Sequence, residues 1–233
     1  MASTPPTNEA FLREVDEELR RDELQSLWQR YGRWAVGAVL LVLAAWGGWI
    51  FWENQRTKAA GLEGEELSLA LDDLQSGNTA AAEEKLKKLS TSDHDGYRAS
   101  ALMAQAGITM EKGDTAGAAK QFGAIAADAG IAQPWRDLAL IRQTAAEFDT
   151  AKPDEIVARL KPLAVRGNPW FGSAGEMVAM SYLKMGKPEL AGKLFADIGK
   201  DESVPESIRS RAVQMAGSLG VDAVDTSSKK VDQ

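Results

Sequence analysis

The sequence predicts an all-α protein in which one membrane-spanning helix precedes a solenoid of about four helical hairpins and a C-terminal capping helix. Three observations support this prediction. The composition is rich in the helix formers Ala, Leu, Glu, Lys and Gln, a charge-free run of nineteen residues lies near residue 40, and helix breaks recur every 35 to 38 residues. Alternating β-branched and aromatic runs, the usual signature of strands, are missing from the sequence.

The charge-free run at residues 34–52 reads WAVGAVLLVLAAWGGWIFW. At about 1.5 Å of rise per residue it makes about 28 Å of helix, close to the roughly 30 Å thickness of a bilayer's hydrocarbon core. Trp34 stands at one edge of the run and Trp49 and Trp52 at the other, and indole rings favour the membrane–water boundary. A buried core helix of this length would carry a polar face, so the run predicts a helix that crosses a lipid bilayer.

A cleaved signal peptide is the main alternative, but 33 residues precede the run and no small-x-small cleavage site follows it. The basic flanks predict the direction of crossing, because Lys and Arg concentrate on the cytoplasmic side. Four basic residues lie close before the run and two close after it: Arg20, Arg21, Arg30 and Arg33, against Arg56 and Lys58. The N-terminus is therefore expected in the cytoplasm and residues 53–233 outside it. In a Gram-negative bacterium this places the protein in the inner membrane, with its C-terminal domain in the periplasm.

The flanking segments have simpler predictions. Residues 1–8 (MASTPPTN) read as a disordered N-terminus, and residues 9–33 place apolar side chains at helical spacing among charges. This pattern predicts an amphipathic cytoplasmic helix that lies on the membrane, meets a partner or simply extends the anchor. Residues 221–233 hold no aromatic residue and few apolar ones, which predicts a disordered tail after a domain at residues 53–220.

The repeats consist of a first helix, a short break and a second helix with apolar residues at offsets of four and three. The breaks are Gly77-Asn78, Gly113-Asp114, Ala151-Lys152-Pro153 and Gly186-Lys187-Pro188. The second helices carry four apolar triplets: Ala82, Leu86 and Leu89; Ala118, Phe122 and Ile125; Ile156, Leu160 and Leu163; Ala191, Phe195 and Ile198. This spacing places each triplet in one stripe, which predicts a face packed against the partner helix.

Each break contains residues that suit a helix end. Gly adopts the left-handed conformation that closes a helix, and Asn78 and Asp114 are predicted to cap the helix that follows. Pro153 and Pro188 suit a first helical turn, where the missing N–H needs no partner. A last helix from about Pro205 to Leu219 is predicted to cap the array.

This layout resembles a tetratricopeptide array whose usual period is slightly stretched. Tyr182 stands at the usual tyrosine position of the fourth unit, whereas Asp73 and Glu147 replace that tyrosine in units one and three. The alternative is an irregular helical bundle with hairpins punctuated by glycine.

The residues predict neither an enzyme nor a nucleic-acid binder. No nucleophile, phosphate-loop or metal-ligand pattern is present, and His94 is the only histidine, so no catalytic residue, metal site or cofactor is predicted. A turn or capping role is expected for His94, which lies between two aspartates before Gly96. The net charge of −7 and the lack of a basic stripe argue against a nucleic-acid partner.

The chain also resembles the ancillary Sec-translocon subunit family, most closely from Gly32 to Ala60, where Ala35-Val36-Gly37, Gly47-Gly48-Trp49, Trp52 and Asn54 match its pattern. The resemblance implies a single-pass bacterial inner-membrane protein with a periplasmic tetratricopeptide-like domain. Its implied partners are the Sec translocon, a membrane-anchored periplasmic foldase and client polypeptides, as expected of a chaperone-associated scaffold. An envelope-assembly or division scaffold and a signalling adaptor remain alternatives that use the same repeats.

The first helix of each unit lines the concave face of a tetratricopeptide array, so its face positions are the predicted partner-binding residues. Three of them are methionines, whose flexible side chains suit unlike apolar partners. The alternative is that several of these residues are core. The predicted set is Leu67, Leu71, Met103, Met110, Ile141, Phe148, Met180 and Leu183.

Overall fold

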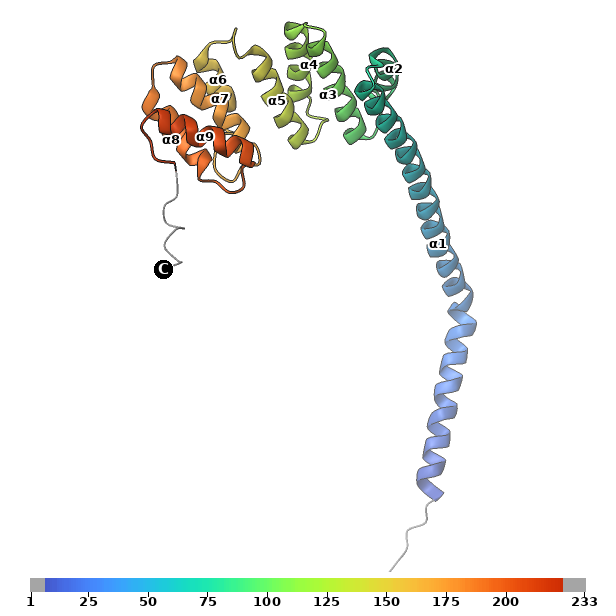
Figure 1. Ribbon diagram of the computed structural model, residues 1–233. Helices are drawn as coiled ribbons and strands as arrows, with labels where there is room; N and C mark the ends of the chain where they lie inside the picture. The colour runs from blue at the N-terminus through green and yellow to red at the C-terminus, as the bar shows by residue number, and fades with distance from the viewer. Residues whose placement is uncertain (1–6, 224–233) are drawn as a thin grey trace, which may run out of the picture. The chain divides into compact units, whose positions relative to one another are not determined.

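The computed structural model describes residues 7–223, and every regular element in that range is an α-helix (Figure 1). The all-α prediction is therefore confirmed. Residues 1–6 and 224–233, where the sequence predicted disorder, lie outside the described residues. The helices are α1 (Thr7–Gln75), α2 (Thr79–Leu89), α3 (Asp95–Glu111), α4 (Thr115–Ala127), α5 (Gln133–Glu147), α6 (Pro153–Leu160), α7 (Phe171–Lys184), α8 (Pro188–Gly199) and α9 (Glu206–Ser218).

The chain divides into two compact units at the Gly61–Leu62 bond, and each is described by itself. In the first unit, the backbone of α1 is helical from Thr7 onward. The side chains of residues 7–33 lie outside the described part, so their amphipathic face stays a prediction. The segment Val36–Asn54 is long and apolar enough to cross a membrane, with a mean hydropathy of 1.6 and none of it buried. This window begins two residues after the predicted span.

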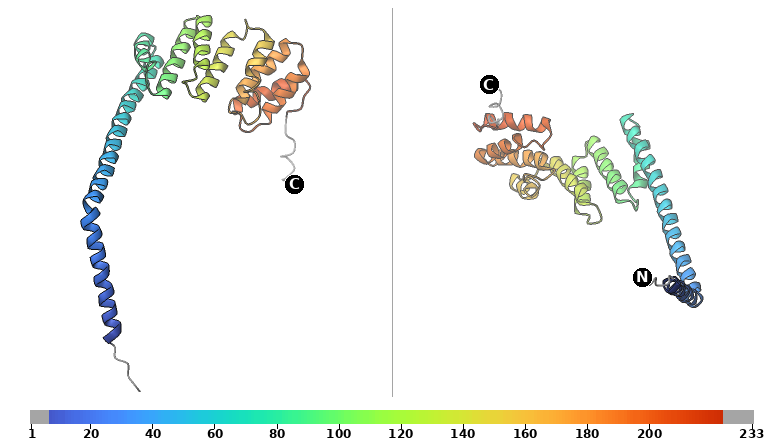
Figure 2. Two further views of the ribbon diagram at one scale, coloured as in Figure 1. Left: turned by 180° about the vertical axis from the view of Figure 1, so that it is seen from behind. Right: turned by 90° about the horizontal axis from the view of Figure 1, so that it is seen from below.

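The second unit begins with the last turns of α1 and continues as helical hairpins. Consecutive helices from α2 to α9 contact one another, and α3, α4 and α5 lie side by side in chain order (Figure 2). The first helices of successive hairpins also touch, α3 with α5 and α5 with α7, and α7 reaches α9 in addition. Contacts between neighbouring units and between alternate helices are those of a repeat solenoid.

The glycine breaks have the predicted conformation. Gly77, Gly113 and Gly186 have φ values of 78°, 87° and 68°, in the left-handed region that a side chain disfavours. All twelve residues of the four apolar triplets are buried, with at most 8% of any of them exposed. The predicted register of the second helices is therefore confirmed.

One predicted cap is wrong and one is right. Asp114 accepts a hydrogen bond from the backbone N–H of Gly117 at 2.8 Å, as an N-cap should. Asn78 makes no side-chain capping bond. Its backbone angles (φ −82°, ψ 55°) are close to those of Asp114 (φ −83°, ψ 73°), so the difference lies in the side chain rather than in the turn.

An ion pair takes the place of the missing tyrosine in two units. Asp73 and Lys85 are 2.5 Å apart, and Glu147 and Arg159 are 2.5 Å apart, each pair spanning twelve residues across a hairpin. In the fourth unit Tyr182 and Leu194, also twelve residues apart, pack against the same two core clusters. The same pair of positions thus joins the two helices by charge in units one and three and by apolar contact in unit four.

The C-terminal end of the packed domain lies beyond the predicted boundary. α9 falls within the expected range of the capping helix, and Ala212 and Ala216 on it are fully buried. The predicted tail beginning at residue 221 starts too early, because Val221 and Ala223 pack against the last core cluster. Gly192 on α8 makes the room: a Cβ there would lie 2.7 Å from a methyl group of Val221.

Candidate functional site

A groove of about 580 Å³ opens between the end of α5, the middle of α7 and the middle and last part of α9. The tertiary contacts of α7 with α5 and with α9 bring its walls together. It is lined by Ala145, Phe148, Asp149, Glu176, Met177, Met180, Phe195, Arg211, Gln214 and Met215.

Half of the apolar residues that line the groove are methionines. Met177 and Met180 are three residues apart on α7 and therefore share a face, and Met215 comes from α9. Phe148 follows the last turn of α5, and all four side chains are partly exposed. Beneath them Phe195 of α8 is fully buried. Thioether side chains have several rotatable bonds and a polarizable sulfur, so this lining can adapt to apolar groups of different shape.

A bidentate salt bridge joins α7 and α9 at the edge of the groove. The Nε and Nη2 atoms of Arg211 donate to Oε1 and Oε2 of Glu176 at 2.8 and 2.9 Å. Hydrogen bonding to Glu176, reinforced by its negative charge, raises the pKa of Arg211 above its usual value. The planar guanidinium and carboxylate fix the relative position of the two helices more tightly than a single hydrogen bond would.

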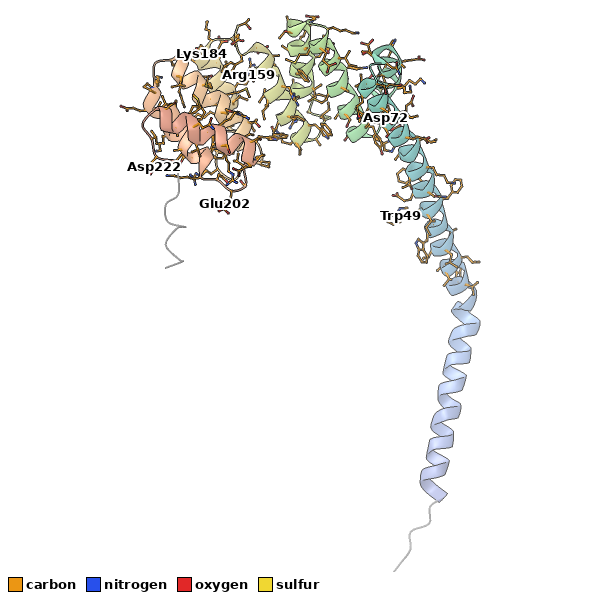
Figure 3. The ribbon with its side chains drawn as sticks, viewed as in Figure 1. Trp49, Asp72, Arg159, Lys184, Glu202 and Asp222 are labelled. Carbon is orange, nitrogen blue, oxygen red and sulfur yellow. The ribbon has the colours of Figure 1, made fainter. Side chains whose placement is uncertain are left out.

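Lys184 ties the end of α7 to the end of α5 (labelled in Figure 3). Its Nζ atom donates to the backbone oxygen of Phe148 at 3.0 Å and lies 4.1 Å from the centre of the Phe148 ring. It also lies 3.5 Å from Oδ1 of Asp149. The three acidic and basic groups that line the groove, Asp149, Glu176 and Arg211, are thus each within an ion pair. A ligand would be selected by apolar contact rather than by net charge.

A second cavity, of about 540 Å³, lies among α4, α5 and α6 but offers less to a ligand. Its lining consists of small alanines, threonines and charged residues, and it contains the Glu147–Arg159 pair. Since those two charges satisfy each other, the cavity has no large apolar group or free charge of that pair with which to hold a partner.

The structure brings two of the eight predicted binding residues, Phe148 and Met180, into the groove. Ile141 is 7% exposed and belongs to the core, so its prediction as a binding residue is wrong. Its position on α5 faces α6 and α7 rather than solvent. The other five lie outside the groove. Met103 and Met110 are partly buried and pack against the core cluster of α3 and α4. Leu67 packs against the core cluster of α1, α2 and α3, and Leu183 packs against that of α7, α8 and α9. Leu71 is exposed.

Sequence reasoning missed the rest of the lining, above all Met177 and Met215. Met177 could have been found, because it lies one helical turn before Met180. Met215 could not, because its place in the groove depends on how α9 packs across α7. Phe195 was predicted as a core residue and forms the base of the groove as well.

Among the described residues no group of three or more His, Asp or Glu side chains could hold a metal ion. His94 lies in the short loop before α3, at the N-cap position, but makes no side-chain capping bond, so only the capping half of the expected turn or capping role is wrong. Its Nδ1 atom lies 3.0 Å from Oε2 of Glu63, which also accepts a hydrogen bond from Ser92 at 2.6 Å. This half-buried cluster fastens the last part of α1 to the loop between α2 and α3.

A family model described as a tetratricopeptide repeat-like domain matches residues 25–203, which is more than half of the chain. The matched region includes the apolar segment of α1 as well as the hairpins from α2 to α8. No curated protein and no solved structure matches the chain.

Proposed function

The chain belongs to the tetratricopeptide repeat-like domain family, and we propose that it is a membrane-anchored scaffold whose α5–α7–α9 groove binds apolar segments of other proteins. The observation that carries this proposal is the groove itself, in which three methionines and a phenylalanine from three helices are partly exposed. Repeat domains of this kind act as protein-interaction scaffolds, so a polypeptide is the ligand class that the family supports.

The membrane anchor in this proposal is the segment Val36–Asn54. Its length of nineteen residues and its apolar side chains, none of them buried, support a spanning helix. Trp49 projects from the side of α1 near one end of that segment (Figure 3). The excess of arginine before the segment supports a cytoplasmic N-terminus, with the repeats on the periplasmic side of a bacterial inner membrane.

The groove suits segments that are not yet folded. Unfolded chains expose apolar side chains without a fixed arrangement, and a methionine lining adapts to many of them. Because the rim charges are already paired, binding does not require a particular charge on the ligand. The resemblance of the anchor region to ancillary Sec-translocon subunits supports a more specific role. In that role the scaffold lies beside the Sec translocon and a membrane-anchored foldase and holds client polypeptides as they emerge.

Copurification of the full chain from membranes in mild detergent tests this role. Translocon components in the eluate, identified by mass spectrometry, are the expected result. Enrichment of envelope-assembly or division proteins without translocon components would instead support the second scaffold role. Repeating the experiment with residues 1–30 deleted and the anchor kept tests the signalling alternative, because that role needs the cytoplasmic segment whereas the other two do not.

A further inference from the structure

The part of α1 that belongs to the second unit has an outer face distinct from the groove. Leu62 and Leu69 are 69% and 49% exposed, and because they lie seven residues apart they share one side of the helix. Glu65 and Asp72 (labelled in Figure 3) lie on the same side, three residues after each leucine, and are exposed. We define these four residues as the outer face of α1.

The other acidic residues of this helical segment all lie on its inner side, where each forms an ion pair. Glu63 contacts His94 at 3.0 Å, Glu66 contacts Lys88 at 3.3 Å and Asp73 contacts Lys85 at 2.5 Å. The core residue Ala70 is fully buried there, flanked by Leu67 and Leu74. This side holds α1 on the array.

Glu65 and Asp72 differ from those three acids, since neither has an ion-pair partner among the described residues. A terminal helix of a repeat array normally presents a polar outer face, because no further repeat covers it. Here two leucines interrupt that face, and three residues after each comes an exposed acid that pairs with no basic group in the part of the chain that the structure describes. Apolar and acidic groups therefore alternate along about three turns of an uncovered helix.

We propose that the outer face of α1 docks a basic amphipathic helix of a partner protein. Leucines seven residues apart match the apolar stripe of such a helix, and Glu65 and Asp72 match Lys or Arg residues beside that stripe. Charge complementarity selects this occupant over two others. A parallel second copy would place Glu65 and Asp72 against the same acids of its partner, and an anionic lipid surface would be repelled by both carboxylates.

The test measures binding of two labelled synthetic helical peptides to the full chain in nanodiscs of zwitterionic lipid, with empty discs subtracted. Both peptides carry leucines seven residues apart; one has lysines beside them and the other has glutamates. The basic peptide is expected to bind saturably and at least about fivefold more tightly than the acidic one, since two exposed ion pairs are gained in one case and two repulsions in the other. The double variant E65K/D72K should reverse this preference. L62S/L69S should weaken binding of the basic peptide by a similar factor.

Matched controls separate the surface from general effects. Leu190 on α8 is 48% exposed, so L190S removes a leucine as exposed as Leu69 from another part of the array and should leave binding unchanged. Glu84 on α2 is also exposed, and E84K tests the effect of a charge change away from the outer face. Far-UV circular dichroism checks that every variant keeps its helical content.

Three results would overturn the proposal. The first is the absence of saturable binding of the basic peptide at millimolar concentration, and the second is equal binding of both peptides. The third is that the chain self-associates, measured as the number of copies per nanodisc, and that L62S/L69S abolishes this self-association. That result would show that a second copy covers the outer face of α1. M180Q in the groove is expected to leave the difference in affinity between the basic and the acidic peptide unchanged, because binding in the groove does not depend on the charge of the ligand. A failure of the outer face of α1 is therefore distinct from a failure of the groove.

Discussion

Glu147 on α5 and Arg159 on α6 form a half-buried ion pair, with 2.5 Å between Oε2 and Nη1, at the two positions that Tyr182 and Leu194 occupy in the fourth unit. Asp73 and Lys85 repeat this arrangement in the first unit, also at 2.5 Å. In units one and three an ion pair therefore joins the two helices at the positions where the fourth unit has Tyr182 and Leu194.

Replacing both members of this pair should cost less stability than replacing one. Arg159→Leu leaves the half-buried Glu147 carboxylate without its partner and is expected to lower the free energy of unfolding by about 1–2 kcal/mol. Glu147→Tyr with Arg159→Leu installs the residue types of the fourth unit and should recover at least half of that loss. Urea unfolding of the full chain in mild detergent measures the cycle. A double variant whose loss equals the sum of both single losses would show that the two positions do not act together.

The buried ring of Phe195 should contribute strongly to stability. Phe195 is fully buried in the last core cluster, so Phe195→Ala leaves a cavity and should lower the free energy of unfolding by about 3–5 kcal/mol. Phe122, 3% exposed in the α3–α4 cluster, should behave in the same way. Leu190→Ala is the exposed control and should change stability by under about 0.5 kcal/mol. Losses below about 1 kcal/mol at both phenylalanines would mean that the packing of the hairpins is misassigned.

The contact between Gly192 and Val221 should be sensitive to a single methyl group. A Cβ at residue 192 would lie 2.7 Å from a Val221 methyl carbon, so Gly192→Ala should push the segment 221–223 off α8. We expect faster proteolysis after Leu219, detected by mass spectrometry of the cleaved chain. Gly107→Ala on α3 is the matched control, because a Cβ there meets nothing within 4 Å and alanine favours a helix. Equal protection of the C-terminal segment in both variants would rule out this packing.

The direction of membrane crossing is open to a direct test. An enzyme reporter that folds only in the periplasm should be active when fused after residue 60 and inactive when fused before residue 30, because the arginine excess keeps the N-terminus in the cytoplasm. The reverse activity pattern would place the repeats in the cytoplasm and remove the envelope role.

Local patterns in the sequence predicted most of the fold. The triplet Ala191, Phe195 and Ile198 repeats the spacing of the other second helices, and a repeated stripe of this kind has to face a partner helix. Gly186 was predictable for the same reason, since a glycine stands at the same position in three of the four breaks. The ion pair Glu147–Arg159 was not predicted, because it joins residues on different helices and no periodicity within either helix indicates it.

The groove was predictable only in part. Phe148 and Met180 follow from the register of first helices, and the same register wrongly includes Ile141, which α6 and α7 cover. Met215 enters the groove because α9 packs across α7. That crossing is set by tertiary contacts such as the bidentate salt bridge between Glu176 and Arg211. Residues of one helix predict a face, whereas a groove needs the relative placement of three.

The groove is tested most directly by the affinity of the full chain, in zwitterionic nanodiscs, for an unfolded, reduced and alkylated small protein. Met177→Gln with Met180→Gln removes the apolar lining on α7 while keeping side-chain length. We expect this change to weaken binding by roughly tenfold or more, because burying each methionine contributes about 1.5 kcal/mol or more. Met103→Gln with Met110→Gln makes the same change on α3, outside the groove, and should weaken binding less than about twofold once both doubles are confirmed to be folded. Equal affinity of the two double variants for the unfolded protein would contradict the assignment of the groove as the binding site.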